Sequence, residues 1–117
     1  MAKKGTGRLQ RIADLIQTEM ARILQREMRD MNIGMATITG VTVSPDLSHA
    51  KIFVSVLPEE SAKDTVEALN DETKNLRYLL AQSVKLRVTP DLRFIYDDST
   101  LRGNRISSLI NDVLKDK

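Results

Sequence analysis

The spacing of apolar residues changes several times along this chain, from the period of a helix to the alternation of a strand and back. An opening run at steps of three and four residues predicts a helix over about residues 7–29. A β-branched run at 36–44 and an alternating run at 50–57 predict two strands. The link between them is short and contains Ser-Pro-Asp, so we expect an antiparallel hairpin.

A glycine interrupts the alternation of the first predicted strand. Ile38 and Gly40 share one parity of the sequence, whereas Val41 and Val43 share the other. A glycine at such a slip is typical of a β-bulge, in which one strand carries an extra residue. We therefore expect a bulge near Gly40.

Helical spacing returns in the second half of the chain. A proline and an acidic first turn begin this region, and apolar residues at helical spacing continue to about Lys85. The stretch DETKN at 71–75 contains no glycine or proline. The residues therefore leave open one long helix or two helices with a kink.

A third strand and a last helix complete the pattern. Leu92, Phe94 and Tyr96 alternate as in a strand. Ser99 or Thr100 is expected to cap the last helix. The apolar stripe of that helix is Ile106, Leu109, Ile110, Val113 and Leu114.

Length and composition restrict the class of protein. A chain of 117 residues corresponds to about one domain, which we expect to span 1–117 with a flexible basic arm at 1–6. The absence of cysteine excludes disulfides, cysteine catalysis and thiolate metal sites. No apolar run approaches the length of a membrane span, and the basic start MAKKGTGR lacks an apolar signal core. We therefore expect a cytoplasmic protein without a membrane partner.

Charge is distributed unevenly, although its net value at pH 7 is only +2. Residues 1–29 carry seven Lys and Arg against three acids, and residues 74–93 carry five against one. Residues 57–72 carry six acids against one lysine. Blocks of opposite sign predict a polarised surface whose basic side favours a polyanionic partner, although separate solvated faces would give the same pattern.

Candidate catalytic or metal-binding residues are few. Asp91, Asp97 and Asp98 cluster around the third predicted strand, but adjacent residues of a strand point to opposite faces. The position of the last two before a predicted helix favours capping over catalysis. His49 is the single histidine and lacks a nearby nucleophile motif or second ligand, which favours a surface position in the hairpin turn. We expect no enzyme activity, metal, cofactor or small-molecule substrate.

The basic residues are the remaining candidates for function. The chain contains neither GxxxxGK[ST] nor GxGxxG, and aromatic residues make up only 3%, which disfavours a phosphate loop and base stacking on aromatic platforms. Lysine and arginine contacts bind the phosphate backbone without reading sequence. The candidate RNA-binding residues are Lys3, Lys4, Arg8, Arg11, Lys74, Arg77, Lys85, Arg87 and Arg93.

The five-residue phrase V-[ST]-P-D-L occurs at 43–47 and again at 88–92. It could mark a duplicated site with paired aspartates, or a device that leads the chain into a strand. Proline restricts the residue before it to extended conformations, and Asp46 or Asp91 can close an Asx-type turn. The second interpretation needs no catalytic aspartate. It places the second copy among the basic residues of 85–93, which it would help to display.

Four segments are informative as a set, in their order and spacing. They are GRLQRIADLIQTEMARILQREMRD, GMATITGVTVSPDLSHAKIFVSVL, LRYLLAQSVKLRVTPDLRFIYDDS and RISSLI. Together they resemble the ribosome-binding factor A family of bacterial small-subunit maturation factors over about residues 7–113. The hairpin V-S-x-D-L-x-x-A-K and the strand start L-R-x-x-P-x-L-x-F-x-Y-D carry most of this similarity.

The resemblance implies a type II K-homology-like α+β fold, in the order α-β-β-α(kinked)-β-α, with the helices packed on one face of a three-stranded sheet. It implies a monomeric, non-enzymatic, cytoplasmic protein that binds the 30S ribosomal subunit and its 16S rRNA near the 5′-terminal helix, in late maturation and rRNA processing. The family's interhelical kink of alanine, any residue and glycine corresponds here to Glu72, Thr73 and Lys74. Charge alone leaves an alternative, a small protein-interaction module that uses the acidic stretch 57–72.

Overall fold

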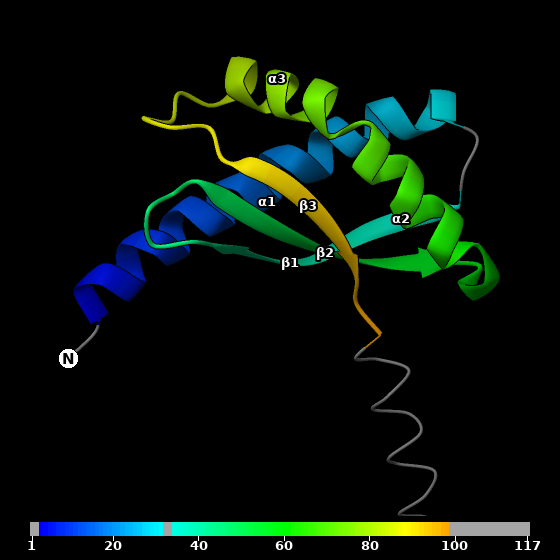
Figure 1. The fold of residues 1–117 in the computed structure, drawn as a ribbon, viewed down its shortest axis with the longest axis horizontal. Coiled ribbons are helices and arrows are strands. Elements are labelled where there is room, and N and C mark those ends of the chain that lie inside the picture. Colours follow the sequence, from blue (N-terminus) through cyan, green and yellow to red (C-terminus); the bar gives the residue numbers. More distant parts are fainter. Residues whose placement is uncertain (1–2, 32–33, 99–117) are drawn as a thin grey trace, which may run out of the picture.

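The structure, a computed structural model, describes residues 3–31 and 34–98 (Figure 1). Its elements in chain order are α1 (Lys3–Met31), β1 (Met35–Val43), β2 (His49–Leu57), the short 3-10 helix η1 (Glu59–Ser61), α2 (Ala62–Asp71), α3 (Thr73–Ser83) and β3 (Asp91–Tyr96). The predicted order is confirmed as far as β3. The last predicted helix and its cap at Ser99 or Thr100 lie outside the described residues.

The described strands form one sheet in the order β1-β2-β3. β1 and β2 are antiparallel, as the hairpin predicted, and β2 and β3 are parallel. The expected bulge is confirmed, because the register shifts between Ile38 and Gly40. Thr39 is the extra residue, so Ile38 and Val41 lie on the same face of the sheet despite a spacing of three residues.

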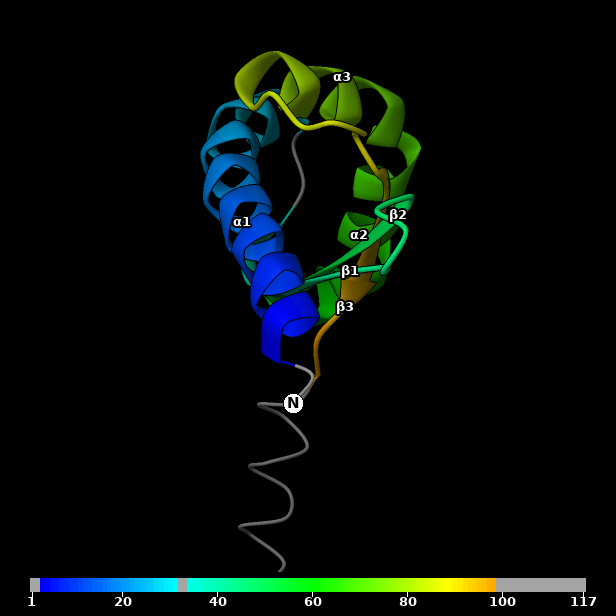
Figure 2. The same cartoon turned by 90° about the vertical axis from the view of Figure 1, so that its left-hand side faces the viewer.

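Helices cover one face of the sheet, and the core lies between the two layers (Figures 1 and 2). α1 packs against β1, α2 against β3 and α3 against α1. In β2 every second side chain from Ala50 to Val56 is buried, which is the alternation expected when only one face of a sheet is covered. Fully buried core side chains include Ile16, Met20, Ile23, Ile52, Leu69, Leu76, Leu80 and Phe94.

The second helical region consists of two helices that separate at Glu72. The backbone of Glu72 has φ −96° and ψ 8°, outside the helical range, and its N–H is shared between two carbonyl oxygens of the preceding turn. Thr73 Oγ1 donates to Asn70 O at 3.0 Å. Because φ at Glu72 is negative, the break needs no glycine. The kink that the resemblance placed at residues 72–74 is therefore present with glutamate and lysine at its ends.

The start of α1 corrects one expectation. The sequence predicted a helix from about Gly7, whereas α1 begins at Lys3. Glycine weakens a helix without forbidding it, and extending an existing helix needs no new nucleation. Lys3 and Lys4 therefore belong to the first turn of α1, and residues 1 and 2 lie outside the described part.

The two V-[ST]-P-D-L phrases lie side by side at one end of the sheet. His49 pairs with Asp91 where β2 and β3 begin, and Asp91 N donates to Ser48 O at 2.9 Å. In the first copy Asp46 Oδ1 accepts from Ser48 N at 3.1 Å, which is the predicted Asx-type turn. In the second copy the Asp91 carboxylate forms an ion pair with Arg77 instead, at 3.5 Å. Both copies lead into strands, as expected.

The first turn makes a pH-dependent contribution to stability. Hydrogen bonds from the Ser48 hydroxyl, the Ser44 hydroxyl and the Ser48 amide lower the pKa of Asp46 from 3.8 to about 2. A lowered folded-state pKa stabilises the fold above about pH 3.8, and that contribution is lost as the pH falls through about 2. Because Asp46 is exposed, solvent screening keeps the effect modest.

Substitution of Asp46 by asparagine tests this contribution. The carboxylate is the form that the serine donors stabilise, so the wild type should have the higher unfolding midpoint where Asp46 is ionised. We expect the difference in thermal midpoint between the wild type and Asp46→Asn to be largest above about pH 4 and to shrink toward about pH 2. A difference that stays constant across this range would contradict the assignment.

Candidate nucleic-acid interface

α1 and α3 run antiparallel, and this determines which residues meet at one end of the molecule. Ser83 Oγ donates to Glu19 Oε1, and Asn75 Nδ2 donates to Glu27 Oε1 at 3.2 Å. The order of these two contacts means that the first half of α1 extends beyond the C-terminal end of α3. There it lies beside the segment 84–90, which links α3 to β3 (Figure 1).

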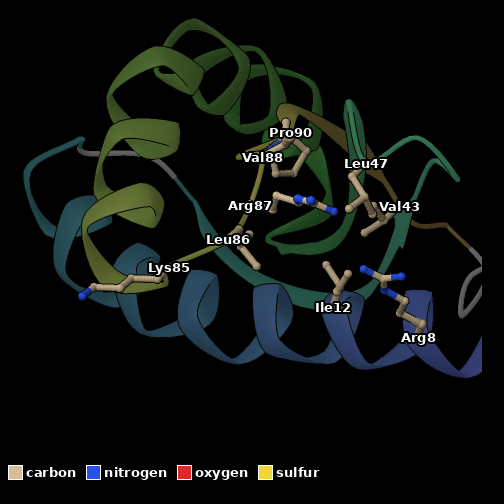
Figure 3. A pocket seen from close by; sticks show the side chains of 9 residues that line it. All are labelled: Arg8, Ile12, Val43, Leu47, Lys85, Leu86, Arg87, Val88 and Pro90. Carbon is tan, nitrogen blue, oxygen red and sulfur yellow. The ribbon is translucent and has the colours of Figure 1, made fainter.

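A hollow of about 180 Å³ lies between this part of α1, the turn that joins β1 to β2 and the segment 84–90. Figure 3 shows the side chains that line the hollow, which are Arg8, Ile12, Val43, Leu47, Lys85, Leu86, Arg87, Val88 and Pro90. Both V-[ST]-P-D-L phrases therefore contribute to it, together with three of the predicted RNA-binding residues.

These three basic residues meet at the hollow although the sequence places them far apart. Arg8, Lys85 and Arg87 are exposed. In Figure 3 the guanidinium groups of Arg8 and Arg87 extend toward the hollow, whereas Lys85 points away from it. None of the described lining residues is acidic, and within residues 3–31 and 34–98 the three have no ion-pair or hydrogen-bond partner. Their positive charge is therefore available to an anion.

Arg77 has an intramolecular role that its charge did not predict. Its guanidinium donates to Thr89 O at 2.8 and 3.2 Å and to Pro90 O at 3.3 Å. It also lies 3.5 Å from the Asp91 carboxylate. Because these contacts hold the segment 84–90 against α3, Arg77 positions the residues that line the hollow.

Arg77→Ala should loosen this segment. We expect the free energy of unfolding to fall by about 1 kcal/mol, since hydrogen bonds to partly exposed backbone carbonyls are lost. Amide hydrogen exchange in 84–90 should become faster. Arg77→Lys keeps the charge but not the planar set of donors. Its free energy of unfolding and its exchange rates in 84–90 should therefore lie between those of the wild type and of Arg77→Ala.

A matched control for this change is Arg26→Ala, at an exposed arginine of α1 that has no described partner. The control should change the free energy of unfolding by less than about 0.5 kcal/mol. If Arg77→Ala left the exchange rates of 84–90 unchanged, Arg77 would not hold this segment.

Two further predicted RNA-binding residues, Arg11 on α1 and Lys74 on α3, lie at different distances from the hollow. Arg11 is exposed on α1 one turn after Arg8, so the two side chains are neighbours on the helix surface. Lys74 lies in the first turn of α3 next to Asn75, the residue that contacts Glu27. A rise of 1.5 Å per residue separates Glu27 from Arg8 by about 28 Å. Lys74 therefore lies far from the hollow.

Arg93 belongs to a second basic position, which the sequence interpretation did not identify. Its register partner in β2 is Lys51, and both are exposed on the sheet face opposite the helices. Like charges directly opposite each other are unfavourable, so an anion would be accepted here. Lys51 alternates with the buried Ala50 and Ile52, so its place on the exposed face of the sheet could be predicted from the sequence. Its pairing with Arg93 required the register.

Of the residues weighed for catalysis, His49 and Asp91 are register partners where β2 and β3 begin, whereas Asp97 follows the other end of β3. His49 is exposed where β2 begins, and Thr39 Oγ1 donates to Asp97 Oδ2. Among the described residues no group of three or more acidic, histidine or cysteine side chains could hold a metal ion. The described helices also include none with the length and apolar character needed to cross a membrane.

Comparison with known sequences gives a consistent match. The family model described as Ribosome-binding factor A matches residues 8–110. Ribosome-binding factor A of Coxiella burnetii (strain RSA 493 / Nine Mile phase I) is 46% identical over 108 residues, covering 92% of this chain and 91% of that protein. The protein of the same name from Pseudomonas aeruginosa (strain UCBPP-PA14) is 46% identical over 110 residues, covering 92% and 85%.

Comparison with solved structures agrees. The crystal structure of ribosome-binding factor A from Thermus thermophilus has a TM-score of 0.67 at 24% identity and covers 75% of this chain and 94% of its own. A homology model of the Thermus thermophilus factor, fitted into the cryo-electron-microscopy map of its complex with the 30S subunit, has a TM-score of 0.56 at 25% identity. It covers 72% of this chain and 93% of its own. The expected α+β fold of the K-homology-like type is thereby confirmed.

Proposed function

This chain belongs to the ribosome-binding factor A family, and from that premise we propose that it is a non-enzymatic assembly factor of the small ribosomal subunit. It binds the 30S subunit and its 16S rRNA near the 5′-terminal helix, and promotes late 30S maturation and 16S rRNA processing in the cytoplasm. Residues 1–117 act as one RNA-binding domain. The 30S complex of the Thermus thermophilus relative supports this choice of partner.

The observation that carries the proposal is that Arg8 and Arg87 extend toward one hollow, which Lys85 also lines, with no acid among its described lining residues. Uncompensated positive charges on a folded surface attract a polyanion, and a guanidinium can bind a phosphate through two parallel hydrogen bonds. We assign the principal contact with rRNA phosphates to these three residues.

The other basic residues take subordinate places in the proposal. Lys3, Lys4 and Arg11 belong to the first turns of α1, the helix that also carries Arg8, and would add to the contact there. Lys74 lies near the other end of α3, and Arg93 lies on the opposite sheet face. These two would contact RNA only if it extends around the molecule.

The acidic stretch 57–72 supports one orientation of the protein on RNA. Phosphate repels acidic side chains, so η1 and α2 would face away from the rRNA while the hollow faces it. The same acids could bind a basic protein, which is the alternative function. All six are exposed: Glu59, Glu60, Asp64, Glu67, Asp71 and Glu72.

Differential binding is the mechanism available to such a factor. A protein that contacts one conformation of the rRNA more favourably than another shifts the population toward the first, by as much as its affinities differ. A tenfold preference corresponds to about 1.4 kcal/mol, which one or two additional phosphate contacts can supply. In this proposal no residue needs to form or break a covalent bond.

Co-sedimentation with purified 30S subunits tests the proposal. If about four to six phosphates are contacted, log affinity should fall against log salt with a slope of roughly −3 to −5. Nuclease treatment of the subunits should abolish binding. Salt-independent binding, or a complex that survives the nuclease, would favour the protein-interaction module.

A further inference from the structure

We propose that the hollow holds one unstacked base of a single-stranded RNA segment, with Arg8 and Arg87 bound to the adjoining phosphates. The inference rests on the proposed RNA-binding function and specifies which form of RNA the site takes. A duplex is excluded as the occupant, because its bases are stacked and paired and cannot enter a small hollow.

The size and lining of the hollow fit a single ring. An apolar cavity of about 150 Å³ is able to hold benzene. The present hollow, at about 180 Å³, is of similar size and smaller than the sites of drug-sized ligands. Ile12 lines it from α1, Val43 and Leu47 from the hairpin, and Val88 and Pro90 from the segment before β3 (Figure 3). Such a lining offers an apolar surface to the face of a base.

One lining residue is a large apolar side chain that the described fold leaves in contact with water. Val88 is 46% exposed and lines the hollow. Covering such a side chain with a flat ring removes apolar area from water, which favours binding.

The two arginines supply the charge that a nucleotide requires. Arg8 comes from α1 and Arg87 from the segment 84–90, and both guanidinium groups extend toward the hollow (Figure 3). A guanidinium can pair with phosphate and can also stack on a base. A neutral apolar ligand would leave both arginines unpaired, whereas a nucleotide provides a flat face and an anion together.

The backbone at Leu47 supports the same interpretation. Leu47 has φ 64°, the one positive φ at a non-glycine residue of the described chain, in a region that leucine rarely adopts. Its N–H donates to Ser44 O at 2.8 Å, and Asp46 accepts from the Ser44 and Ser48 hydroxyls at 2.7 Å. A well-bonded turn therefore holds an apolar side chain at the hollow where glycine would meet less strain.

Methyl NMR of the full chain with two matched probes tests the proposal. One probe is a short uridine oligonucleotide, and the other is an abasic oligomer with the same number of phosphates. The uridine probe should shift the methyl signals of Ile12, Leu47 and Val88, because a bound ring alters the magnetic field at the side chains it covers. The abasic probe binds through its phosphates alone, so it should leave these methyl signals unchanged. Identical shifts with the two probes would overturn the proposal.

Leu47→Gly is the most informative variant. It removes an apolar side chain from the hollow and relieves the positive φ, so the chain should still fold. We expect its affinity for the uridine probe to fall on the order of tenfold, and its affinity for the abasic probe to stay unchanged. Leu57→Ala, at a leucine that is 65% exposed at the far end of β2, is the matched control and should change neither. Wild-type affinity of Leu47→Gly for the uridine probe would refute the base site.

The outcomes separate this inference from the proposed function. If the wild type binds 30S subunits with the expected salt dependence but does not prefer the uridine probe, RNA binding stands and the base site is wrong. If it binds neither subunits nor oligonucleotides, both are wrong. If a glutamate-rich peptide produces the methyl shifts and the uridine probe does not, the hollow is a protein-binding site and the base site is again wrong.

Discussion

Replacing Arg8, Lys85 and Arg87 together by glutamine should weaken binding to 30S subunits by about 100-fold at ~0.15 M salt. These residues are the proposed principal phosphate contacts. If counterion release is the whole effect, each lost contact lowers affinity by about 4- to 5-fold at this salt concentration. The slope of log affinity against log salt should become shallower by about 2–3, because three fewer counterions are released. Sedimentation binding curves at several salt concentrations measure both quantities.

The matched control removes the same charge from a different part of the surface. Arg26 and Arg29 of α1 and Lys63 of α2 are exposed and do not line the hollow. Their replacement by glutamine gives the same net charge as the first triple variant. We expect affinity to fall by less than about fivefold, through long-range attraction alone. Equal losses in the two variants would show that net charge, and not the meeting of three residues, determines binding.

Phe94→Ala should be strongly destabilising. The Phe94 side chain is 1% exposed and lies in the core on β3. Its backbone forms two hydrogen bonds with Asn70 of α2, with Phe94 N donating at 2.8 Å and Phe94 O accepting at 3.0 Å. A cavity at this junction should lower the free energy of unfolding by about 3–5 kcal/mol. In a chain of this size the thermal midpoint should fall by about 10–20 °C, which calorimetry measures.

Ile95→Ala is the control for this prediction, one residue further along the same strand. Ile95 is half-buried and lies on the sheet face opposite the helices. Its truncation should cost about 1 kcal/mol, since less apolar area leaves the interior. If Ile95→Ala were as destabilising as Phe94→Ala, the second face of the sheet would also be packed against a core.

The helices and strands up to β3 could be predicted from the spacing of their apolar residues. Each element has one buried side, and the residues on that side recur with the period of a helix or of a strand. The change of parity at Gly40 even indicated the bulge, since an extra residue is the way to keep Ile38 and Val41 on one face. The helix break at Glu72 had no such signal. No glycine or proline marks it, and a negative φ allows any residue there. The resemblance to a family located the kink where the residues left two possibilities open.

The candidate site was predictable in composition but not in arrangement. The sequence indicated that basic residues bind the partner, and three of the predicted residues, Arg8, Lys85 and Arg87, line one hollow. Arg77 had the same charge and a neighbouring position in the sequence, yet its guanidinium donates to backbone carbonyls. Lys51 was overlooked because its pairing with Arg93 depends on the strand register.

The sequence by itself determined which side of each element is buried, how the two V-[ST]-P-D-L phrases lead into strands, and which family the chain resembles. Only the tertiary structure decided which residues become neighbours. Because α1 and α3 are antiparallel, Arg8 lies beyond the C-terminal end of α3, near Arg87. Because β2 and β3 are parallel and in register, both V-[ST]-P-D-L phrases lie at the same hollow. The spacing of apolar residues indicates which side of a helix or strand is buried. It does not indicate which distant helix or strand packs against that side, because this depends on how whole elements pack.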